Sequence, residues 1–162
     1  MKKIKFLFLT FCMGLIVTGC AKTPIQETQY QPELLSGYIS INGNILYLDT
    51  VEIIKKEDKD RIKELGLIVE SDLPNGYYIY NETVESVPFE LTDDTTYTFT
   101  DFNLLFINEA NTTRIYETTK KQEFIEGSSY QDISLEEQKI PYFLSVYDKK
   151  VISITEEFIY TQ

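Results

Sequence analysis

The 162-residue sequence contains no histidine and no tryptophan, and its two cysteines, Cys12 and Cys20, both lie near the N-terminus. Without histidine the chain cannot form a Ser-His-Asp or Cys-His catalytic centre, or a zinc site built on imidazole. Because no cysteine follows Cys20, the rest of the chain can form no internal disulfide, thiolate metal site or cysteine nucleophile. We therefore predict a protein that is not an enzyme, with no catalytic residue, metal or cofactor.

Basic residues are scarce beside acidic ones. The chain has 15 Lys and Arg against 26 Asp and Glu, which gives a formal net charge of −11. Such a balance disfavours nucleic acid as a partner, because phosphate binding requires basic patches. It also disfavours a domain that lies flat on anionic lipid. We interpret the charge as a solvated, mutually repelling surface.

The first twenty residues combine a basic start with a short apolar run. Lys2, Lys3 and Lys5 precede the run 6–17, which is too short to span a bilayer, since spanning needs about twenty residues. A basic start, a short apolar core and small residues after it are typical of a secretory signal. An ordinary secretory signal with an unrelated cysteine, or an uncleaved anchor, is the alternative.

The end of this leader, Val17-Thr18-Gly19-Cys20, resembles the lipobox of bacterial lipoprotein precursors. The resemblance implies that signal cleavage falls between Gly19 and Cys20 and that the Cys20 thiol receives diacylglycerol. Two acyl chains would then hold the protein stably on the membrane. We expect a lipid-anchored protein on the extracytoplasmic face of the cell membrane.

The chain divides into three parts on this interpretation. Residues 1–19 are the signal peptide, residues 20–36 form a flexible tether, and residues 37–162 form a single β-rich domain. The tether contains Pro24 and Pro32 and few large apolar residues. A flexible segment of this length has a typical span of about 20–25 Å, which would lift the domain just off the headgroups.

The clearest local signal in the domain is a hairpin. Strands 38–41 and 44–48 flank Asn42-Gly43, which suits a two-residue type I′ turn. This turn places Ile39 opposite Leu46 and Tyr38 opposite Tyr47. The core face would then consist of four residues: Ile39, Ile41, Leu46 and Leu48.

Helical spacing follows over residues 56–66. Glu57 and Arg61 can form an i,i+4 pair, and Gly66 suits the left-handed position of a Schellman ending in which Leu67 contacts Ile62. Ser134 and Glu137 form a capping box for a second, short helix stopped by Pro141. Further strands are predicted at 77–80, 89–91, 97–99, 104–107, 114–116, 142–146 and 151–154, with 124–125 ambiguous.

This pattern predicts a mainly β fold, a small curled sheet or OB-like barrel with one short helix after the second strand. An open α+β sheet is the alternative. The segment 74–81 and the ending 141–146 with 151–158 resemble small exported proteins of Gram-positive bacteria, an uncharacterised family. That resemblance could extend over residues 37–160; it supports one compact domain and adds no mechanism.

Three groups of residues are candidates for function. The pair Glu156-Glu157 could serve hydrolysis, but neighbouring strand residues point to opposite faces. Aspartates 93, 94 and 101 could bind calcium, yet they lack a known loop spacing, and turns favour Asp anyway. The tyrosine-rich strand with Tyr77, Tyr78 and Tyr80 presents rings on both faces, so at least one points outward, and it is the possible binding surface.

The leading hypothesis is a non-enzymatic binding or interaction module anchored through its N-terminal diacylglycerol, with a protein, peptide or glycan as its unknown partner. The first alternative is a carboxylate-based hydrolase acting on cell-wall glycan. The second is an accessory subunit of a membrane complex, which a large exposed apolar patch would favour.

Overall fold

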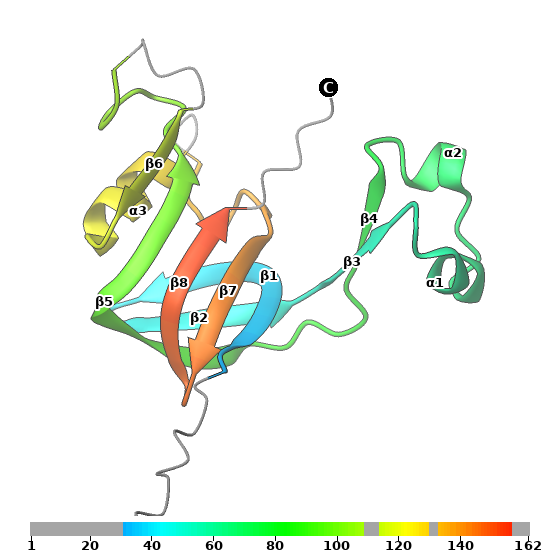
Figure 1. Ribbon diagram of the computed structural model, residues 1–162, viewed down its shortest axis with the longest axis horizontal. Helices are drawn as coiled ribbons and strands as arrows, with labels where there is room; N and C mark the ends of the chain where they lie inside the picture. The colour runs from blue at the N-terminus through cyan, green and yellow to red at the C-terminus, as the bar shows by residue number, and fades with distance from the viewer. Residues whose placement is uncertain (1–30, 109–113, 130–132, 157–162) are drawn as a thin grey trace, which may run out of the picture. The chain divides into compact units, whose positions relative to one another are not determined.

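The computed structural model describes residues 31–108, 114–129 and 133–156 (Figure 1). Gly19, Cys20 and most of the expected tether therefore lie outside the described residues, as does Glu157. The strands are β1 (Glu33–Asn42), β2 (Ile45–Thr50), β3 (Glu52–Lys55), β4 (Tyr77–Tyr80), β5 (Val87–Thr100), β6 (Ile115–Thr118), β7 (Tyr142–Tyr147) and β8 (Lys150–Glu156). The helices are α1 (Lys59–Glu64), α2 (Val69–Asp72) and α3 (Lys121–Ser128).

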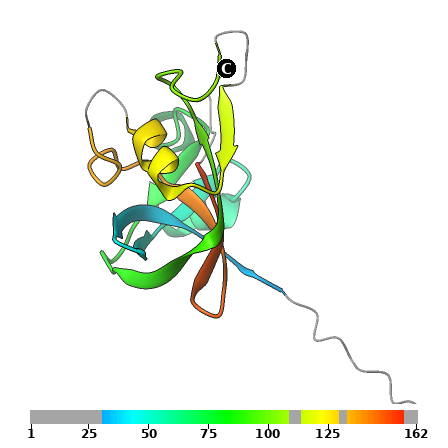
Figure 2. The ribbon, with the colours of Figure 1, turned by 90° about the vertical axis from the view of Figure 1, so that its left-hand side faces the viewer.

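Five strands pair in a closed ring. β1 pairs with β2 and β7, β2 pairs with β5, and β8 pairs with β7 and β5. All of these pairs are antiparallel except β5 with β8. With α3 inserted between the third and fourth strands of the ring (Figure 2), this is the pairing order of an OB-fold barrel. The prediction of a mainly β chain with an OB-like barrel is confirmed.

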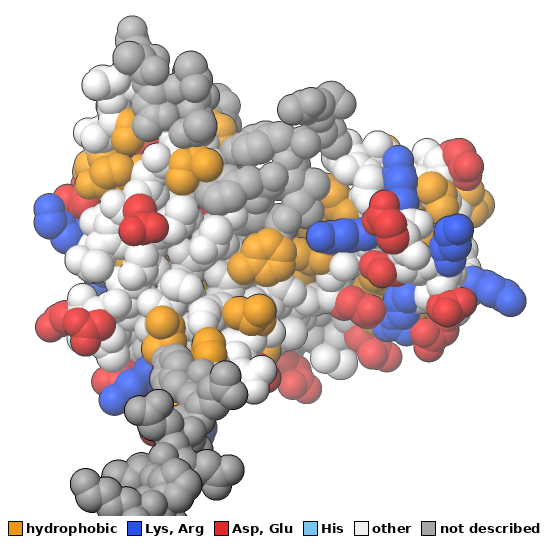
Figure 3. All heavy atoms as spheres, viewed as in Figure 1, with side chains coloured by type: hydrophobic (Ala, Val, Ile, Leu, Met, Phe, Trp, Pro, Cys, Tyr) orange, Lys and Arg blue, Asp and Glu red, His pale blue; other side chains and the backbone are white. Residues whose placement is uncertain are grey.

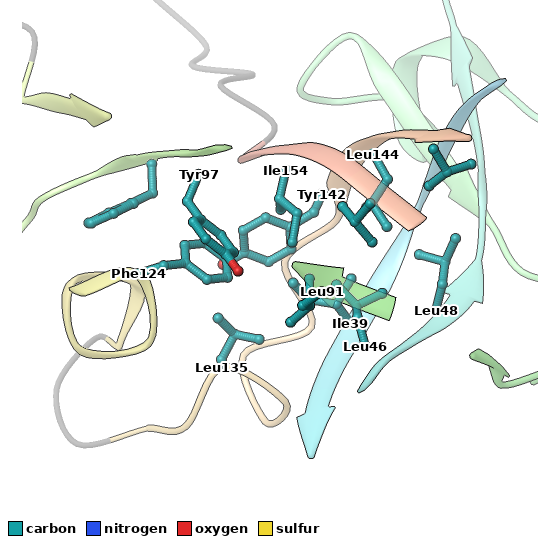
Figure 4. Close-up of a cluster of buried hydrophobic side chains, with 13 residues drawn as sticks. Ile39, Leu46, Leu48, Leu91, Tyr97, Phe124, Leu135, Tyr142, Leu144 and Ile154 are labelled. Atoms are coloured by element: carbon teal, nitrogen blue, oxygen red, sulfur yellow. The ribbon is translucent and has the colours of Figure 1, made fainter. Parts of the chain in front are cut away.

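The core fills the inside of this barrel and extends to α3. Tyr97 of β5 stacks on Phe124 of α3 with ring centroids 4.9 Å apart, and Tyr142 of β7 meets Phe124 edge-on at 5.7 Å. Figure 4 shows these rings packed together beside the aliphatic side chains of β1 and β2. Phe124 is fully buried, so α3 contributes a central part of the core from outside the ring of strands.

The first hairpin has the predicted faces but a different register. Ile39 pairs with Leu48 and Ile41 with Leu46, two residues away from the predicted register. The turn residues are Gly43 and Asn44, and the φ of 62° at Gly43 fits the first central position of a type II′ turn. An offset of two keeps every side chain on its face, so the predicted core face is correct although its partners were wrong.

β1 begins at Glu33, within the range 20–36 that we expected to be a tether, and residues 33–37 pair with β7. Gly37 also lets β2 approach β1 closely, because a Cβ on Gly37 would meet the backbone carbonyl of Asp49 and lie 2.7 Å from a Leu48 methyl carbon.

A second sheet of β3 and β4 packs with α1 and α2 around a core of its own, made of Ile54, Ile62 and Leu73. The predicted Schellman ending of α1 is confirmed, because Gly66 has a φ of 67° and the Leu67 amide donates to the Ile62 carbonyl. Arg61, however, forms ion pairs with Glu52 and Glu64, each at 2.8 Å, in place of the expected partner Glu57.

Three other predictions were wrong in detail. Segments 89–91 and 97–99 belong to one strand, β5, whose pairing with β8 shifts register between Leu91 and Thr96. Residues 104–107 form no strand, because the buried Asp101 carboxylate accepts the amides of residues 105–107. Only half of the capping box at Ser134 is present: the Glu137 carboxylate accepts from the Ser134 amide at 3.1 Å and from the Ser134 hydroxyl at 2.7 Å, and only a turn follows.

Among the described residues, no helix combines the length and the apolar composition that a membrane span requires.

Candidate functional site

A groove of about 160 Å³ runs over the outer face of the first hairpin. Its floor consists of Tyr38, Ser40, Tyr47 and Asp49 of β1 and β2. These residues alternate with the buried residues of the two strands, so the pleat turns them outward. In the register of the hairpin Tyr38 pairs with Asp49 and Tyr47 with Ser40, which makes the two tyrosines diagonal neighbours.

Two loops form the walls of this groove. One wall comes from the segment between β4 and β5, which contributes Ser86 and Val84, and the Val84 side chain is 87% exposed. The other wall comes from the turn before β7, which contributes Glu136 and Lys139. The groove, which we call the tyrosine groove, therefore combines aromatic rings, an exposed aliphatic side chain and charges of both signs.

Asp49 holds the first wall in place. One oxygen of its carboxylate accepts from the Asn81 side-chain amide at 3.1 Å, and the other accepts from the Glu85 backbone amide at 3.2 Å. A carboxylate has about four acceptor positions, so Asp49, which lines the groove, keeps free acceptor capacity.

Tyr38 lies in a partly buried, negatively charged environment. Burial raises the pKa of its hydroxyl most, and the Asp49 carboxylate and Tyr77 raise it further. The hydroxyl therefore stays protonated, and a neutral aromatic ring can contact a cation or an apolar group.

Lys139 places its own ammonium on that ring. The Lys139 Nζ lies 5.4 Å from the centroid of Tyr38, within the range of a cation–π contact. The backbone of Lys139 has a φ of 51°, a left-handed conformation that costs a residue other than glycine about 1–2 kcal/mol. The turn before β7 thus holds this lysine over the groove in a strained backbone conformation.

A separate apolar surface covers the outer face of β1, β7 and β8. Leu34 is 80% exposed, and its strand partner is Ser145. Phe143 and Tyr147 lie two positions to either side of Ser145, and Ile152 lies at the bulge of β8, all three more than a third exposed. Figure 3 shows hydrophobic side chains on the face where β7 and β8 lie. We call these four residues the β7 apolar surface.

A hollow larger than the tyrosine groove adjoins the β7 apolar surface. It has a volume of about 440 Å³ and lies between the start of β5 and the turn of Asp148 and Lys149, with Tyr147 common to both features. The backbone of Asp148 and Lys149 has φ values of 48° and 61°, so two residues without the freedom of glycine form this turn.

The tyrosines of β4 do not form one surface. Tyr78 and Tyr80 pack against the core of the second sheet, and the Arg61 guanidinium lies 5.1 Å from the Tyr80 ring centroid. Tyr77 alternates to the other face of the strand and is close enough to Tyr38 to affect its pKa. Only Tyr77 is thus associated with the tyrosine groove.

Tyr38 and Tyr47 were not identified as site residues from the sequence, although the sequence predicts that they lie side by side. The signal was available, because both tyrosines alternate with core residues and so had to face outward. What the sequence could not show was that loops distant in the chain would wall them in.

The predicted carboxylates do not assemble into a site in the described residues. The Glu156 carboxylate is buried beside β5, where it accepts from the Thr100 amide at 2.7 Å, and burial raises its pKa. Asp93 and Asp94 are exposed at the register shift of β5, whereas Asp101 is fully buried. The described chain brings together no group of three or more potential metal ligands.

Nothing in the described part of the chain indicates enzymatic activity. Glu156 lines neither the tyrosine groove nor the hollow beside β7, which leaves the hydrolase alternative without support from geometry.

No family model, no curated protein and no solved structure matches this chain. The candidate site therefore depends on the geometry described above.

Proposed function

We propose that this protein is a lipid-anchored, non-enzymatic binding module that acts outside the cytoplasmic membrane. The observation that supports binding is the tyrosine groove, in which two outward tyrosines lie on the barrel between two loops. Concave sites with a few aromatic and polar groups are typical of ligand binding. The sequence Val17-Thr18-Gly19-Cys20, with its basic and apolar leader, supports the anchor.

The binding function is tested by cross-linking in intact cells. A photoreactive residue is placed at Tyr47, in the groove floor, or at Glu70 of α2 as the matched control. We expect a discrete adduct from position 47 that is absent from position 70. Identical adduct patterns from the two positions would contradict a binding role for the groove.

The anchor is tested separately by metabolic labelling with a fatty acid. The wild-type chain should take up label and sediment with membranes, whereas Cys20→Ala should do neither. Equal labelling of the two chains would remove the lipid anchor from the proposal.

One observation favours a second candidate, an accessory subunit of a membrane complex. The β7 apolar surface exposes Leu34, Phe143, Tyr147 and Ile152 on neighbouring strands, and clustered exposed apolar side chains often mark protein contacts. The double variant Leu34→Ser/Ile152→Ser should lose any co-purifying membrane complex while keeping its far-ultraviolet circular dichroism. A complex that survives this change would argue against the second candidate.

A further inference from the structure

We infer that the tyrosine groove binds an alkylammonium group, the side chain of a lysine in a basic peptide segment of the partner, and that the Lys139 ammonium occupies this position in the free protein. The inference rests on the proposed binding function and gives it a ligand class.

The first argument is the position of the Lys139 ammonium. Lys139 is an exposed residue, and a lysine on a surface is free to extend into water. Its Nζ nevertheless lies 5.4 Å from the Tyr38 ring centroid, above the groove floor. The groove thus already accommodates one ammonium, and a lysine from a partner would present the same chemical group.

The second argument is the Asp49 carboxylate, which belongs to the residue that pairs with Tyr38 across the hairpin. Asp49 lies in the floor and Glu136 in the wall, and Asp49 uses one acceptor position on each oxygen for Asn81 and Glu85. The remaining lone pairs can accept from an ammonium, which carries three donors. An aromatic face beside a carboxylate favours a cation over an anion or an apolar group.

The third argument is the apolar wall. Val84 is 87% exposed at the groove, so its side chain is accessible to a ligand there. The methylene stem of a lysine buries itself along apolar surface while its ammonium stays with polar groups. Val84 and the Tyr47 ring provide such a surface next to Asp49.

The charge of the chain as a whole agrees with this ligand. With 26 acidic against 15 basic residues, the protein attracts basic segments and repels acidic ones during encounter. A basic peptide is therefore favoured over a polyanion as the occupant of the groove.

The experiment titrates the full chain, in detergent, with a blocked pentapeptide that carries one central lysine and four glycines. The matched peptides carry acetyl-lysine or glutamate at the centre. Nuclear magnetic resonance of labelled tyrosine rings reports binding at Tyr38 and Tyr47. We expect the lysine peptide to produce chemical-shift changes that saturate. The acetyl-lysine peptide should bind at least about five-fold more weakly, because acetylation removes the charge.

Variants of the groove residues show whether the Lys139 ammonium competes with the lysine peptide. Lys139→Met should tighten binding of the lysine peptide about two- to five-fold, because the competing ammonium is gone, and Tyr38→Leu should weaken it by a similar factor. Tyr38→Phe keeps the ring and should bind like the wild type. Lys150→Met, a lysine outside the groove, is the charge-matched control and should change nothing.

Three outcomes would overturn the inference. Equal shifts with the lysine and acetyl-lysine peptides would indicate a neutral ligand, such as a glycan. Weaker binding in Lys139→Met, together with binding of the glutamate peptide, would assign the groove to an anionic partner. An absence of tyrosine shifts at millimolar peptide would exclude a lysine side chain as the ligand. If cross-linking through position 47 still captures a partner, the binding function stands and only the ligand chemistry is wrong.

Discussion

Glu156 illustrates what burial does to a single carboxyl group in this barrel. Burial raises its pKa, and the Thr100 hydrogen bonds only partly oppose that effect. The folded state therefore keeps a proton on Glu156 at pH values where the unfolded chain has lost it. The contribution of such a group to stability falls as the pH rises from the ordinary glutamate value of 4.5 through the raised pKa.

Glu156→Gln removes this titration, and the Gln carbonyl can still accept from the Thr100 amide. We expect the free energy of unfolding of the variant to increase relative to the wild type between about pH 4 and about pH 7. Urea unfolding at both pH values measures the difference. Glu137→Gln is the control with the opposite sign, because hydrogen bonds from Ser134 lower the pKa of Glu137. Parallel pH profiles for Glu156→Gln and the wild type would contradict this prediction.

Asp101 shows why one predicted strand is absent. The apolar residues at 104–107 have strand composition, but their amides have another acceptor. The Asp101 carboxylate accepts from Leu105, Phe106 and Ile107 at 2.8–3.1 Å. Local propensity could not predict this, since a buried carboxylate that collects three amides is a tertiary feature.

At the scale of the element, β1 joins two parts of the ring of strands. It pairs with β2 over its second half and with β7 over its first half, and Gly37 takes part in both pairings. The backbone of β2 approaches so closely there that Gly37 has no room for a side chain.

Gly37→Ala should destabilise the barrel by about 1–3 kcal/mol, because the added methyl group meets a backbone carbonyl that cannot move away cheaply. Leu34→Ala on the same strand, at an 80% exposed position, should stay within about 0.5 kcal/mol of the wild type. Denaturant unfolding with the slope held common measures both. Equal midpoints for Gly37→Ala and the wild type would show that β1 and β2 can separate without cost.

Helix α3 is the element that the sequence left ambiguous at 124–125, and the core explains why it is helical. Its Phe124 ring packs against Tyr97, Phe99 and Tyr142. An isolated eight-residue segment is too short to be a stable helix in water, so this contact, and not propensity, maintains it.

Phe124→Ala should therefore cost about 3–5 kcal/mol of stability and loosen α3. Gln122→Ala, on the exposed side of the same helix, is the matched control and should have little effect. Thermal unfolding monitored by near-ultraviolet circular dichroism of the tyrosines measures the difference. A loss below about 1 kcal/mol for Phe124→Ala would mean that α3 is not part of the cooperative core.

The faces of the first two strands and the end of α1 could be predicted from the sequence, whereas the hairpin turn and the pairing partners could not. Alternation gave the core face of β1 and β2, and Gly66 gave the end of α1. The register of the hairpin depended on which two residues form the turn, and Asn42-Gly43 and Gly43-Asn44 are both plausible by composition. The same limit applies to the tyrosine groove, whose floor follows from alternation and whose walls come from distant segments.

At the scale of the whole molecule, the described chain has two hydrophobic cores. The larger one fills the barrel, and the smaller one, Ile54, Ile62 and Leu73, holds β3, β4, α1 and α2 together. A cluster of three buried residues supplies much less burial than the barrel core. The second sheet should therefore open locally more often than the barrel does.

Leu73→Ala tests this difference, because Leu73 is fully buried in the smaller core. Hydrogen exchange should accelerate strongly at the amides of Leu67 and Tyr78, in the region of that core, and stay unchanged at Leu144 in β7. Leu46→Ala, in the barrel core, should instead accelerate all three. Uniform acceleration by Leu73→Ala would mean that the two cores unfold as one cooperative unit.

Closure of the ring also governs how quickly the protein can fold. The parallel pair of β5 with β8 aligns Glu90 with Lys150, so this contact forms only after a loop of many residues has been ordered. Barrels dominated by such distant pairings fold in about milliseconds to seconds, far more slowly than helical bundles. Until β8 is in place, β5 and β7 remain unsatisfied edges open to pairing with other chains, and this interval is when the protein is most exposed to aggregation.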